Sequence, residues 1–403
     1  MIVAGAGIAG LATAARLAAK GFDVTVFEKN DYPGGKLGLW QKDGYSFDKG
    51  PSLFIQPEIH EELYTSCGKR TEDYFPYSPL DVITHYFFED GTKLNFYPDP
   101  QRTASEIEKV LGVPKEVVLN YLHDADKLYQ DVGRIFLDEP IHQLGTWFTP
   151  RIPKALGTVK MAHLLQSMHT YNEKHLQHPK LVQLFDRYAT YNGSNPYLAP
   201  AMLTMISHFE ITEGTYYPKG GMVSIPRAVY KLGQDLGVQY HFNSRVEKII
   251  TENNVVKGVV VNGEKHEADI VVSNSDVYFT YKNLLDDDSK ANALQKQERS
   301  TSGYIFYWGI KKPFPQLSLH NILFAENYKE EFDTIFNKKD VYHDPTIYIN
   351  ITSKMEAEHA PPGCENWFVF VNAAAASEAE SNRLAPLAKA NILRKLERML
   401  GEP

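Results

Sequence analysis

The first fifty residues alternate between short apolar runs and glycine-rich segments. Residues 2–19 are mostly apolar, but three glycines and Arg16 interrupt them. A membrane-spanning helix would be more continuously apolar, and a secretion signal would begin with a basic region. The pattern instead predicts a strand over 1–4, a turn, a helix that ends at Gly21, and a second strand over 23–28.

Later segments show both strand and helix periodicity. An Asp-Gly pair lies between β-branched and aromatic runs and favours a hairpin with a tight primed turn. An Asn-Gly pair marks a second small hairpin set. The elements predicted are a hairpin over 82–96, helical structure over 101–132, an amphipathic helix over 223–236, a strand over 238–242, the hairpin set over 244–276 with its turn at 262–263, strands over 303–310, 346–351 and 367–372, and a helix over 387–400.

Composition narrows the class of protein. The chain of 403 residues is long for a single core, so we expect two intertwined domains. Its net charge of −8 argues against a nucleic-acid partner. The two cysteines, Cys67 and Cys364, form no CxxC pair, which argues against structural zinc and disulfides and fits a reducing, cytoplasmic setting. We predict no metal site and no membrane span.

The sequence Gly5-Ala6-Gly7-Ile8-Ala9-Gly10 follows the first predicted strand and opens the first helix. In a dinucleotide-binding unit, the first glycine allows the tight turn, the second lets the backbone approach a pyrophosphate, and the third lets the helix pack closely on the strand. The helix N-terminus offers free N–H groups to the phosphates. Glycine triples also arise in ordinary turns, so the context that follows matters.

The context supports a dinucleotide site. Glu28 ends the second strand, eighteen residues after Gly10, where a carboxylate can accept hydrogen bonds from ribose hydroxyl groups. Residues 33–36 then read Pro-Gly-Gly-Lys, which permits a second close backbone approach. A simple nicotinamide dehydrogenase would continue with a helix and a third strand, whereas we expect glycine-rich loops here that wrap a larger cofactor. Residues 33–36 and the next glycine-containing run, residues 44–51, could each be a surface turn when taken alone.

These segments together resemble the N-terminus of the phytoene desaturase family, within the wider group of amine oxidase-like flavoproteins. The matching residues are those from Gly5 to Glu28, Gly34-Gly35-Lys36 and Asp48-Lys49-Gly50-Pro51. The resemblance implies noncovalently bound FAD. It also implies that the backbone of Val246 meets the adenine, although this residue alone reads as a buried strand valine. The implied FAD-binding residues are Gly5, Gly7, Ile8, Ala9, Gly10, Glu28, Lys29, Gly35, Lys36, Gly50, Pro51 and Val246.

Several other segments look closer to one bacterial branch of that family, the 1-hydroxycarotenoid 3,4-desaturases. That branch implies oxidation of the C3–C4 bond of an acyclic, 1-hydroxylated carotenoid, with oxygen or a membrane quinone as electron acceptor. The alternatives are a phytoene desaturase, an amine oxidase-like enzyme with a polar substrate, and a nonenzymatic polyene carrier. The segments that carry the branch resemblance are 189–196, 306–309, 319–322 and 363–368.

The resemblance implies an α/β fold in which a Rossmann-type FAD-binding domain is interleaved with a substrate domain of mixed sheet and helical cap. We expect the FAD-binding domain over 1–75 and 206–282, and the substrate domain over 76–205 and 283–403. Nothing after Asn372 resembles the closing flavin-binding block of the family, so we expect the C-terminal part to be missing. A chain without that block would bind FAD poorly.

One stretch differs from the rest in charge. Residues 140–172 contain no Asp or Glu, although the protein is acidic overall. They include Arg151, Lys154 and Lys160 beside large apolar side chains such as Trp147 and Phe148. This combination suits an anionic lipid surface, and we expect peripheral membrane attachment through it. The alternative is a helical cap with a mildly basic solvent face.

Desaturation needs no protein nucleophile, because oxidised flavin accepts a hydride. We found no Ser/His/Asp set, paired carboxylates or HExxH motif with convincing spacing. His208 and Glu210 lie near a domain boundary and are interpreted as structural. We therefore assign no catalytic residue.

Overall fold

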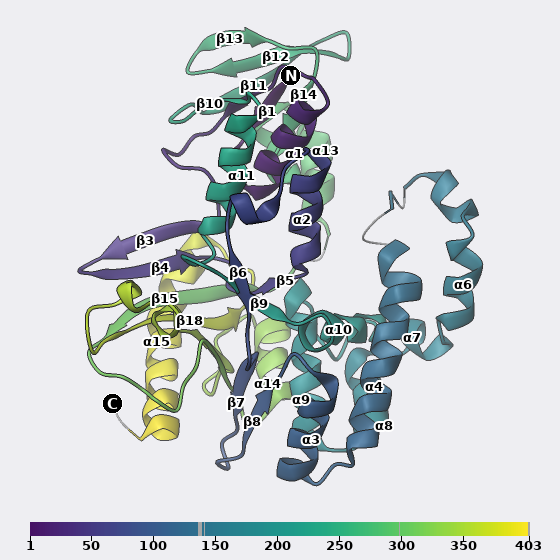
Figure 1. Ribbon diagram of the computed structural model, residues 1–403, viewed down its shortest axis with the longest axis vertical. Coiled ribbons are helices and arrows are strands. Elements are labelled where there is room, and N and C mark those ends of the chain that lie inside the picture. The colour runs from purple at the N-terminus through teal and green to yellow at the C-terminus, as the bar shows by residue number, and fades with distance from the viewer. Residues whose placement is uncertain (136–138, 141, 298, 402–403) are drawn as a thin grey trace. The chain divides into compact units, whose positions relative to one another are not determined.

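The computed structural model describes residues 1–135, 139–140, 142–297 and 299–401 (Figure 1). The chain divides into two units that alternate along the sequence. Unit 1 comprises residues 1–78, 216–298 and 356–361. Unit 2 comprises residues 79–215, 299–355 and 362–403.

Unit 1 is built on a parallel sheet with the strand order β10-β2-β1-β14. The helices α1 (Ile8–Ala19) and α11 (Ser224–Asp235) pack together over this sheet, and their buried faces include Leu11, Ala14 and Leu232. Parallel pairing and the crossover helix α1 confirm the dinucleotide-type arrangement predicted for this segment. The strands are β1 (Ile2–Ala4), β2 (Thr25–Phe27), β10 (Gln239–His241) and β14 (Val271–Ser273).

Smaller elements complete unit 1. An antiparallel sheet of β11, β12 and β13 follows β10 and precedes β14, as the predicted hairpin set requires. These elements are β11 (Val246–Glu252), β12 (Val255–Val261), β13 (Glu264–Glu267), β3 (Gly38–Lys42), β4 (Tyr45–Lys49), β5 (Phe54–Ile55), β6 (Tyr77–Pro79), β9 (Thr215–Pro218), α2 (Pro57–Ser66), α12 (Val277–Phe279), α13 (Asp288–Gln295), the π-helix η6 (Thr280–Leu284), and the 3₁₀ turns η1 (Thr71–Asp73) and η9 (Ala357–His359).

Two Asp-Gly pairs in the chain form different turns. Asp43 and Gly44 both have positive φ and connect the paired residues Lys42 and Tyr45, which is a two-residue primed turn. The glycine-rich loops expected from residues 33–36 and 44–51 are therefore wrong in part, because residues 38–49 form the hairpin β3–β4. At residues 90–91 only the glycine has positive φ, so the primed turn predicted there is also wrong. The backbone N–H of Phe88 donates to Thr92 O at 3.0 Å and closes a longer loop.

Unit 2 contains a six-stranded sheet with the order β15-β18-β17-β16-β7-β8. All pairs are antiparallel except β16 with β7. The predicted strands β7, β8, β15, β17 and β18 are confirmed, and β16 is an addition. The strands are β7 (Thr84–Phe87), β8 (Lys93–Phe96), β15 (Ser302–Ile310), β16 (His320–Leu323), β17 (Ile347–Asn350) and β18 (Glu365–Ala373).

Alternate side chains of this sheet enter two cores. On one face, Tyr86 and Ile322 join a large aromatic core with the helices that follow β8. On the other face, Leu323 and Val369 pack with Ile392 of α15. The predicted helix over 387–400 begins earlier, at Glu378, because Ser377 and Glu380 form a capping box.

The other helical elements of unit 2 follow β8 or link the later strands. They are α3 (Pro100–Leu111), α4 (Lys115–Leu128), α6 (Arg151–Thr158), α7 (Met161–Leu165), α8 (Met168–Leu176), α9 (Pro179–Asp186), α10 (Ile206–Ile211), α14 (Tyr328–Asp333), α15 (Glu378–Leu400), the π-helices η2 (Tyr129–Gly133) and η7 (Thr334–Lys338), and the 3₁₀ turns η3 (Leu144–Phe148), η4 (Arg187–Asn192), η5 (Ala201–Met205) and η8 (Thr352–Lys354).

The chain passes from one unit to the other later than the boundaries expected from the sequence. Residues 206–215 belong to unit 2, because Ile206 and Ile211 enter its aromatic core. Residues 283–297 belong to unit 1, where α13 packs against α12. The return of residues 356–361 to unit 1 was not expected. Among the described residues, no helix has both the length and the apolar content needed to cross a bilayer.

Candidate cofactor-binding site

A cavity of about 1010 Å³ lies in unit 1 at the carboxyl ends of β1, β2 and β14. Ligands of parallel α/β sheets bind at this edge. Of the residues expected to bind FAD, all except Gly10 and Gly50 line the cavity. Those present are Gly5, Gly7, Ile8, Ala9, Glu28, Lys29, Gly35, Lys36, Pro51 and Val246. Their contact with FAD remains a prediction.

The two glycine segments lie side by side in this cavity. Gly7 and Gly34 form an isolated parallel bridge, and the Gly34 N–H donates to Ala6 O at 2.8 Å. A Cβ atom on Gly35 would lie 3.2 Å from Gly7 Cα, so there is little room for a side chain. Gly7 is also the N-cap residue of α1. Among the described residues, no side chain caps this end of the helix by a hydrogen bond, so the first N–H groups of the helix are available to an anion.

Gly10 and Gly50 do not line the cavity, but they allow the close backbone packing around it. A Cβ atom on Gly10 would lie 2.2 Å from Gly5 O, which is closer than any side chain tolerates. Gly50 has a φ of +91°, and its Cβ would lie 2.6 Å from Lys36 O. Both glycines therefore allow backbone segments to approach each other, which is the packing role expected of Gly10.

Glu28 is a buried carboxylate at the end of β2. Its Oε2 accepts a hydrogen bond from the Ala6 N–H at 2.7 Å, so it holds the glycine turn in place. Its Oε1 accepts from the backbone N–H and the side-chain amide of Asn30 at 2.8 and 2.7 Å. A carboxylate has about four lone-pair positions, so these three bonds leave capacity for a ribose hydroxyl.

Asp48, in the segment Asp48-Lys49-Gly50-Pro51, holds the backbone that leads into the helix α11. Its two carboxylate oxygens accept the N–H groups of Met222 and Val223 at 2.9 and 3.0 Å, immediately before α11. Burial raises the pKa of the Asp48 carboxyl, and these two N–H groups oppose that rise. A Cβ on Gly221 would lie 2.6 Å from Asp48 Oδ2, so glycine is required beside it.

Sequence reasoning missed several residues that line the cavity. Asn274 and Asp276 follow β14, and Arg245 precedes β11. The Asn274 amide lies 2.8 Å from the Cβ positions of both Gly7 and Gly10. The sequence did show that residues 274–276 follow a predicted strand. Only the structure shows that this strand pairs with β1 and so brings them to the cavity. Lys29, Lys36 and Arg245 together supply positive charge, which suits a pyrophosphate.

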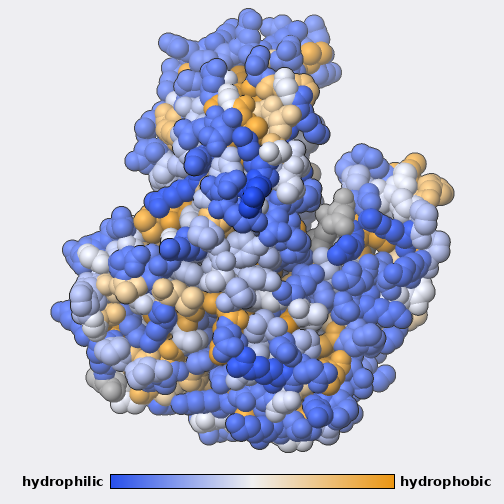
Figure 2. All heavy atoms as spheres, viewed as in Figure 1, coloured by the Kyte–Doolittle hydropathy of each residue, from blue (hydrophilic) through white to orange (hydrophobic). Residues whose placement is uncertain are grey.

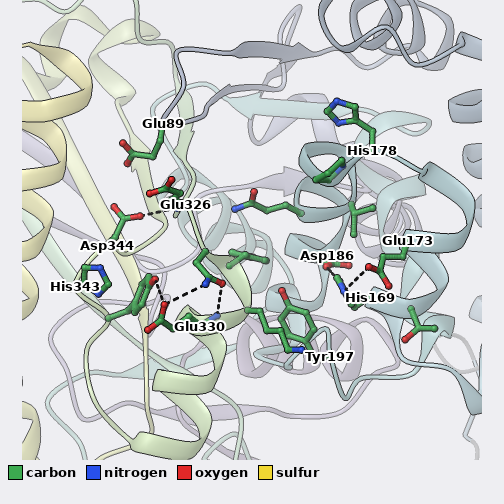
Figure 3. Close-up of a pocket in the computed structure, with 18 of the residues that line it drawn as sticks. Glu89, His169, Glu173, His178, Asp186, Tyr197, Glu326, Glu330, His343 and Asp344 are labelled. Atoms are coloured by element: carbon green, nitrogen blue, oxygen red, sulfur yellow. Dashed lines mark hydrogen bonds and ion pairs between the residues drawn. The ribbon is translucent and has the colours of Figure 1, made fainter.

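A second cavity, of about 1460 Å³, lies within unit 2 and has a different lining (Figure 3). At its wall, His169 Nδ1 lies 2.6 Å from Asp186 Oδ2, and the Asn172 amide donates to Asp186 Oδ1 at 2.8 Å. Asp186 raises the pKa of His169, while burial raises the pKa of Asp186. Charged side chains such as Glu173 and Glu330 surround this cavity, so it does not suit an apolar ligand.

Comparison with known proteins agrees with the geometry. Residues 8–402 match the model of the flavin-containing amine oxidoreductases. The chain is 45% identical over 400 residues to a 1-hydroxycarotenoid 3,4-desaturase of Flavobacterium sp. (strain P99-3), covering 99% of this chain and 82% of that protein. It is 34% identical over 375 residues to a zeta-carotene-forming phytoene desaturase of Myxococcus xanthus, covering 92% of this chain and 71% of that protein.

The fold also has solved counterparts. An oxidoreductase from Methanosarcina mazei superposes with a TM-score of 0.63 at 16% identity, covering 99% of this chain and 84% of that chain. This likeness confirms the expected fold class, amine oxidase-like with mixed sheet and helix. The chain belongs to the flavin-containing amine oxidoreductase family, as an FAD-dependent oxidoreductase with carotenoid desaturases among its relatives.

Proposed function

We propose that this protein introduces a C=C bond into an acyclic carotenoid, by 3,4-desaturation of a 1-hydroxylated substrate. The observation that carries the proposal is the identity of 45% over nearly the whole chain to a desaturase of that name, against 34% to a phytoene desaturase. The second candidate is therefore desaturation of phytoene itself.

In this proposal the cavity of unit 1 holds FAD. Gly5, Gly7 and the N-terminus of α1 hold the pyrophosphate, Glu28 holds a ribose, and Val246 lies beside the adenine. When bound there, FAD would supply the hydride acceptor for the desaturation, and the second hydrogen would leave the adjacent carbon as a proton to a base or to water. We propose oxygen or a membrane quinone as the final electron acceptor.

We further propose that the polyene lies along an aromatic strip of unit 2, formed by Tyr307, Phe368, Phe370 and Tyr348. These side chains share the sheet face opposite α15. The ring centroids of Tyr307 and Phe368 are 5.8 Å apart, and those of Phe368 and Tyr348 are 6.3 Å apart. All except Phe368 are partly exposed, so their rings offer apolar surface that suits an apolar ligand.

The acid-free stretch supports membrane attachment as part of this function. Leu144, Phe148, Leu156 and Leu165 are 79, 85, 73 and 75% exposed, and Figure 2 shows apolar surface around α6. Scattered exposed apolar residues are normal, but a cluster of this kind marks a contact surface. We propose that η3, α6 and α7 insert apolar side chains into the lipid interface, from which the substrate enters.

We propose that the basic residues of this stretch add little to that attachment, because each is paired within the protein. Arg151, Lys154 and Lys160 form ion pairs with Glu139, Asp131 and Asp124, with N–O distances of 3.0, 2.6 and 2.8 Å. We therefore expect similar co-sedimentation with neutral and anionic liposomes. The double variant Trp147→Ser/Phe148→Ser should bind both more weakly, whereas Phe22→Ser/Ile59→Ser, at exposed apolar positions of unit 1, should not.

The function is tested with FAD-loaded protein in liposomes that carry either a 1-hydroxylated acyclic carotenoid or phytoene. Loss of two hydrogens from the hydroxylated substrate alone, with a red shift in absorption, is the expected result. Conversion of phytoene alone would favour the second candidate. Flavin that stays oxidised with both polyenes under anaerobic conditions would contradict desaturation and favour a polar substrate or a carrier.

A further inference from the structure

A buried polar cluster lies at one end of the aromatic strip in unit 2. It consists of Arg187, Glu210, Tyr86, Tyr188 and Tyr191. Arg187 Nη2 donates to Tyr86 Oη at 2.9 Å and to Glu210 Oε1 and Oε2 at 3.3 and 3.2 Å. Tyr191 Oη donates to Glu210 Oε2. The guanidinium carbon lies 5.6, 4.7 and 5.5 Å from the ring centroids of Tyr86, Tyr188 and Tyr191.

His320 connects the strip to the cluster. Its ring stacks on Tyr348, the last member of the strip, with centroids 6.0 Å apart, and its Nδ1 lies 2.8 Å from Tyr348 Oη. In the next strand, Tyr86 pairs with Ile322, two residues after His320 on the same face. Burial and the charge of Arg187 lower the pKa of His320 to about 3, so this histidine is neutral.

Two polar atoms of the cluster have no hydrogen-bond partner among the described residues. They are Arg187 Nε and Tyr188 Oη, and both are buried. Tyr188 has no exposed surface, and the Arg187 side chain is 10% exposed. Buried polar groups almost always find partners, so these two unpaired atoms beside one charged pair can bond to a polar group of a ligand once the side chains that cover them move aside.

We infer that this cluster binds a hydroxyl group at the end of an otherwise apolar polyene, an inference that rests on the proposed desaturase function. The Arg187–Glu210 pair is already balanced in charge, so a neutral ligand group fits and an ionised one does not. A hydroxyl oxygen can accept from the Arg187 Nε–H, and the same group can donate to or accept from Tyr188 Oη. A hydrocarbon terminus would leave both positions unpaired.

This arrangement makes Tyr188 and Arg187 specificity-determining residues for the hydroxylated substrate. A site built to hydrogen-bond a substrate hydroxyl discriminates strongly against the analogue that lacks it, because its own polar groups then stay unpaired. The aromatic strip contacts both substrates equally, so discrimination arises at the cluster.

The decisive variant is Tyr188→Phe, because it removes a hydroxyl group that has no partner within the described protein. The measurement is retention of a 1-hydroxylated acyclic carotenoid and of its unhydroxylated counterpart by FAD-loaded protein, with both offered from the same liposomes. We expect wild-type protein to prefer the hydroxylated polyene. Tyr188→Phe should lower retention of that polyene by roughly three- to tenfold and leave the other unchanged.

Tyr64→Phe is the matched control, because Tyr64 in unit 1 is also fully buried with an unpartnered hydroxyl. It should change retention of neither polyene. Equal retention of both polyenes by wild-type protein, or equal losses in Tyr188→Phe, would overturn the inference. Retention needs no turnover, so failure of the wild type to desaturate either polyene would overturn the proposed function alone.

Discussion

The cavity of unit 1 and the polar cluster of unit 2 each bury a glutamate, but they hold it by different means. Two of the three hydrogen bonds to Glu28 come from backbone N–H groups, and all three come from Ala6 and Asn30 near the glycine turn. Glu210 is held by the side chains of Arg187 and Tyr191, on a different element. A site made of backbone groups depends on small residues that permit its shape, whereas a site made of side chains depends on charge balance.

The largest expected effect on FAD binding concerns backbone shape. Gly10→Ala should destabilise unit 1 by about 3 kcal/mol and abolish FAD binding, because its Cβ would lie 2.2 Å from the Gly5 carbonyl oxygen, which cannot move aside. Chemical unfolding and flavin fluorescence measure the two effects. Gly21→Ala is the control, because no described atom lies within 4 Å of the added Cβ; its φ of +87° costs some backbone strain, which Gly10 does not have, so its loss should be smaller. Equal losses in both variants would mean that close approach at Gly10 is unimportant.

Charge balance predicts the next effect. Arg187→Met should destabilise unit 2 by about 3–5 kcal/mol, because it leaves Glu210 buried without its cation. The double variant Arg187→Met/Glu210→Met should recover most of that loss. Urea unfolding of the wild type, the single variant and the double variant measures both the loss of stability and its recovery. If the double variant is no more stable than the single one, charge balance does not govern this cluster.

A smaller effect is expected at Glu28. Glu28→Gln replaces a carboxylate oxygen by an amide donor that faces the N–H groups of Ala6 or Asn30. We expect FAD affinity to fall by roughly ten- to a hundredfold, as the loss of hydrogen bonds to a charged group predicts. Fluorescence titration with FAD measures the change. Glu62→Gln, whose side chain is 66% exposed, should bind FAD like the wild type, and unchanged affinity in Glu28→Gln would exclude a ribose contact.

The smallest effect is a pH dependence that comes from unit 2. The pKa of His320 is about 3 in the folded protein and about 6.5 in an unfolded chain. Between these pH values only the unfolded chain binds the proton. The stability that comes from keeping His320 neutral is therefore complete above pH 6.5 and is lost as the pH falls towards 3. By pH 5 the loss should be about 1–2 kcal/mol. His320→Gln should flatten the stability profile over this window, and an unaltered slope would contradict the buried neutral state.

The same contrast explains what could be predicted. The glycine turn, Glu28 and the crossover helix follow each other within thirty residues, so their spacing was enough to place them. The primed turn at Asn262-Gly263 was likewise local, and both residues have positive φ. Asp90-Gly91 failed because turn type depends on the pairing of the strands on either side, which the dipeptide does not specify.

The sequence by itself determined the parallel sheet of unit 1, the cavity built on its glycines and the family to which the chain belongs, because these depend on short-range spacing and backbone freedom. Only the tertiary structure decided that Asp48 binds the two residues before α11, that Asn274 lies over the glycine turn, and that Glu210 is the counterion of Arg187. These partners are 23 to 269 residues apart, and no local pattern records such a distance. Burial assembled them, since each polar group had to find a partner once water was excluded.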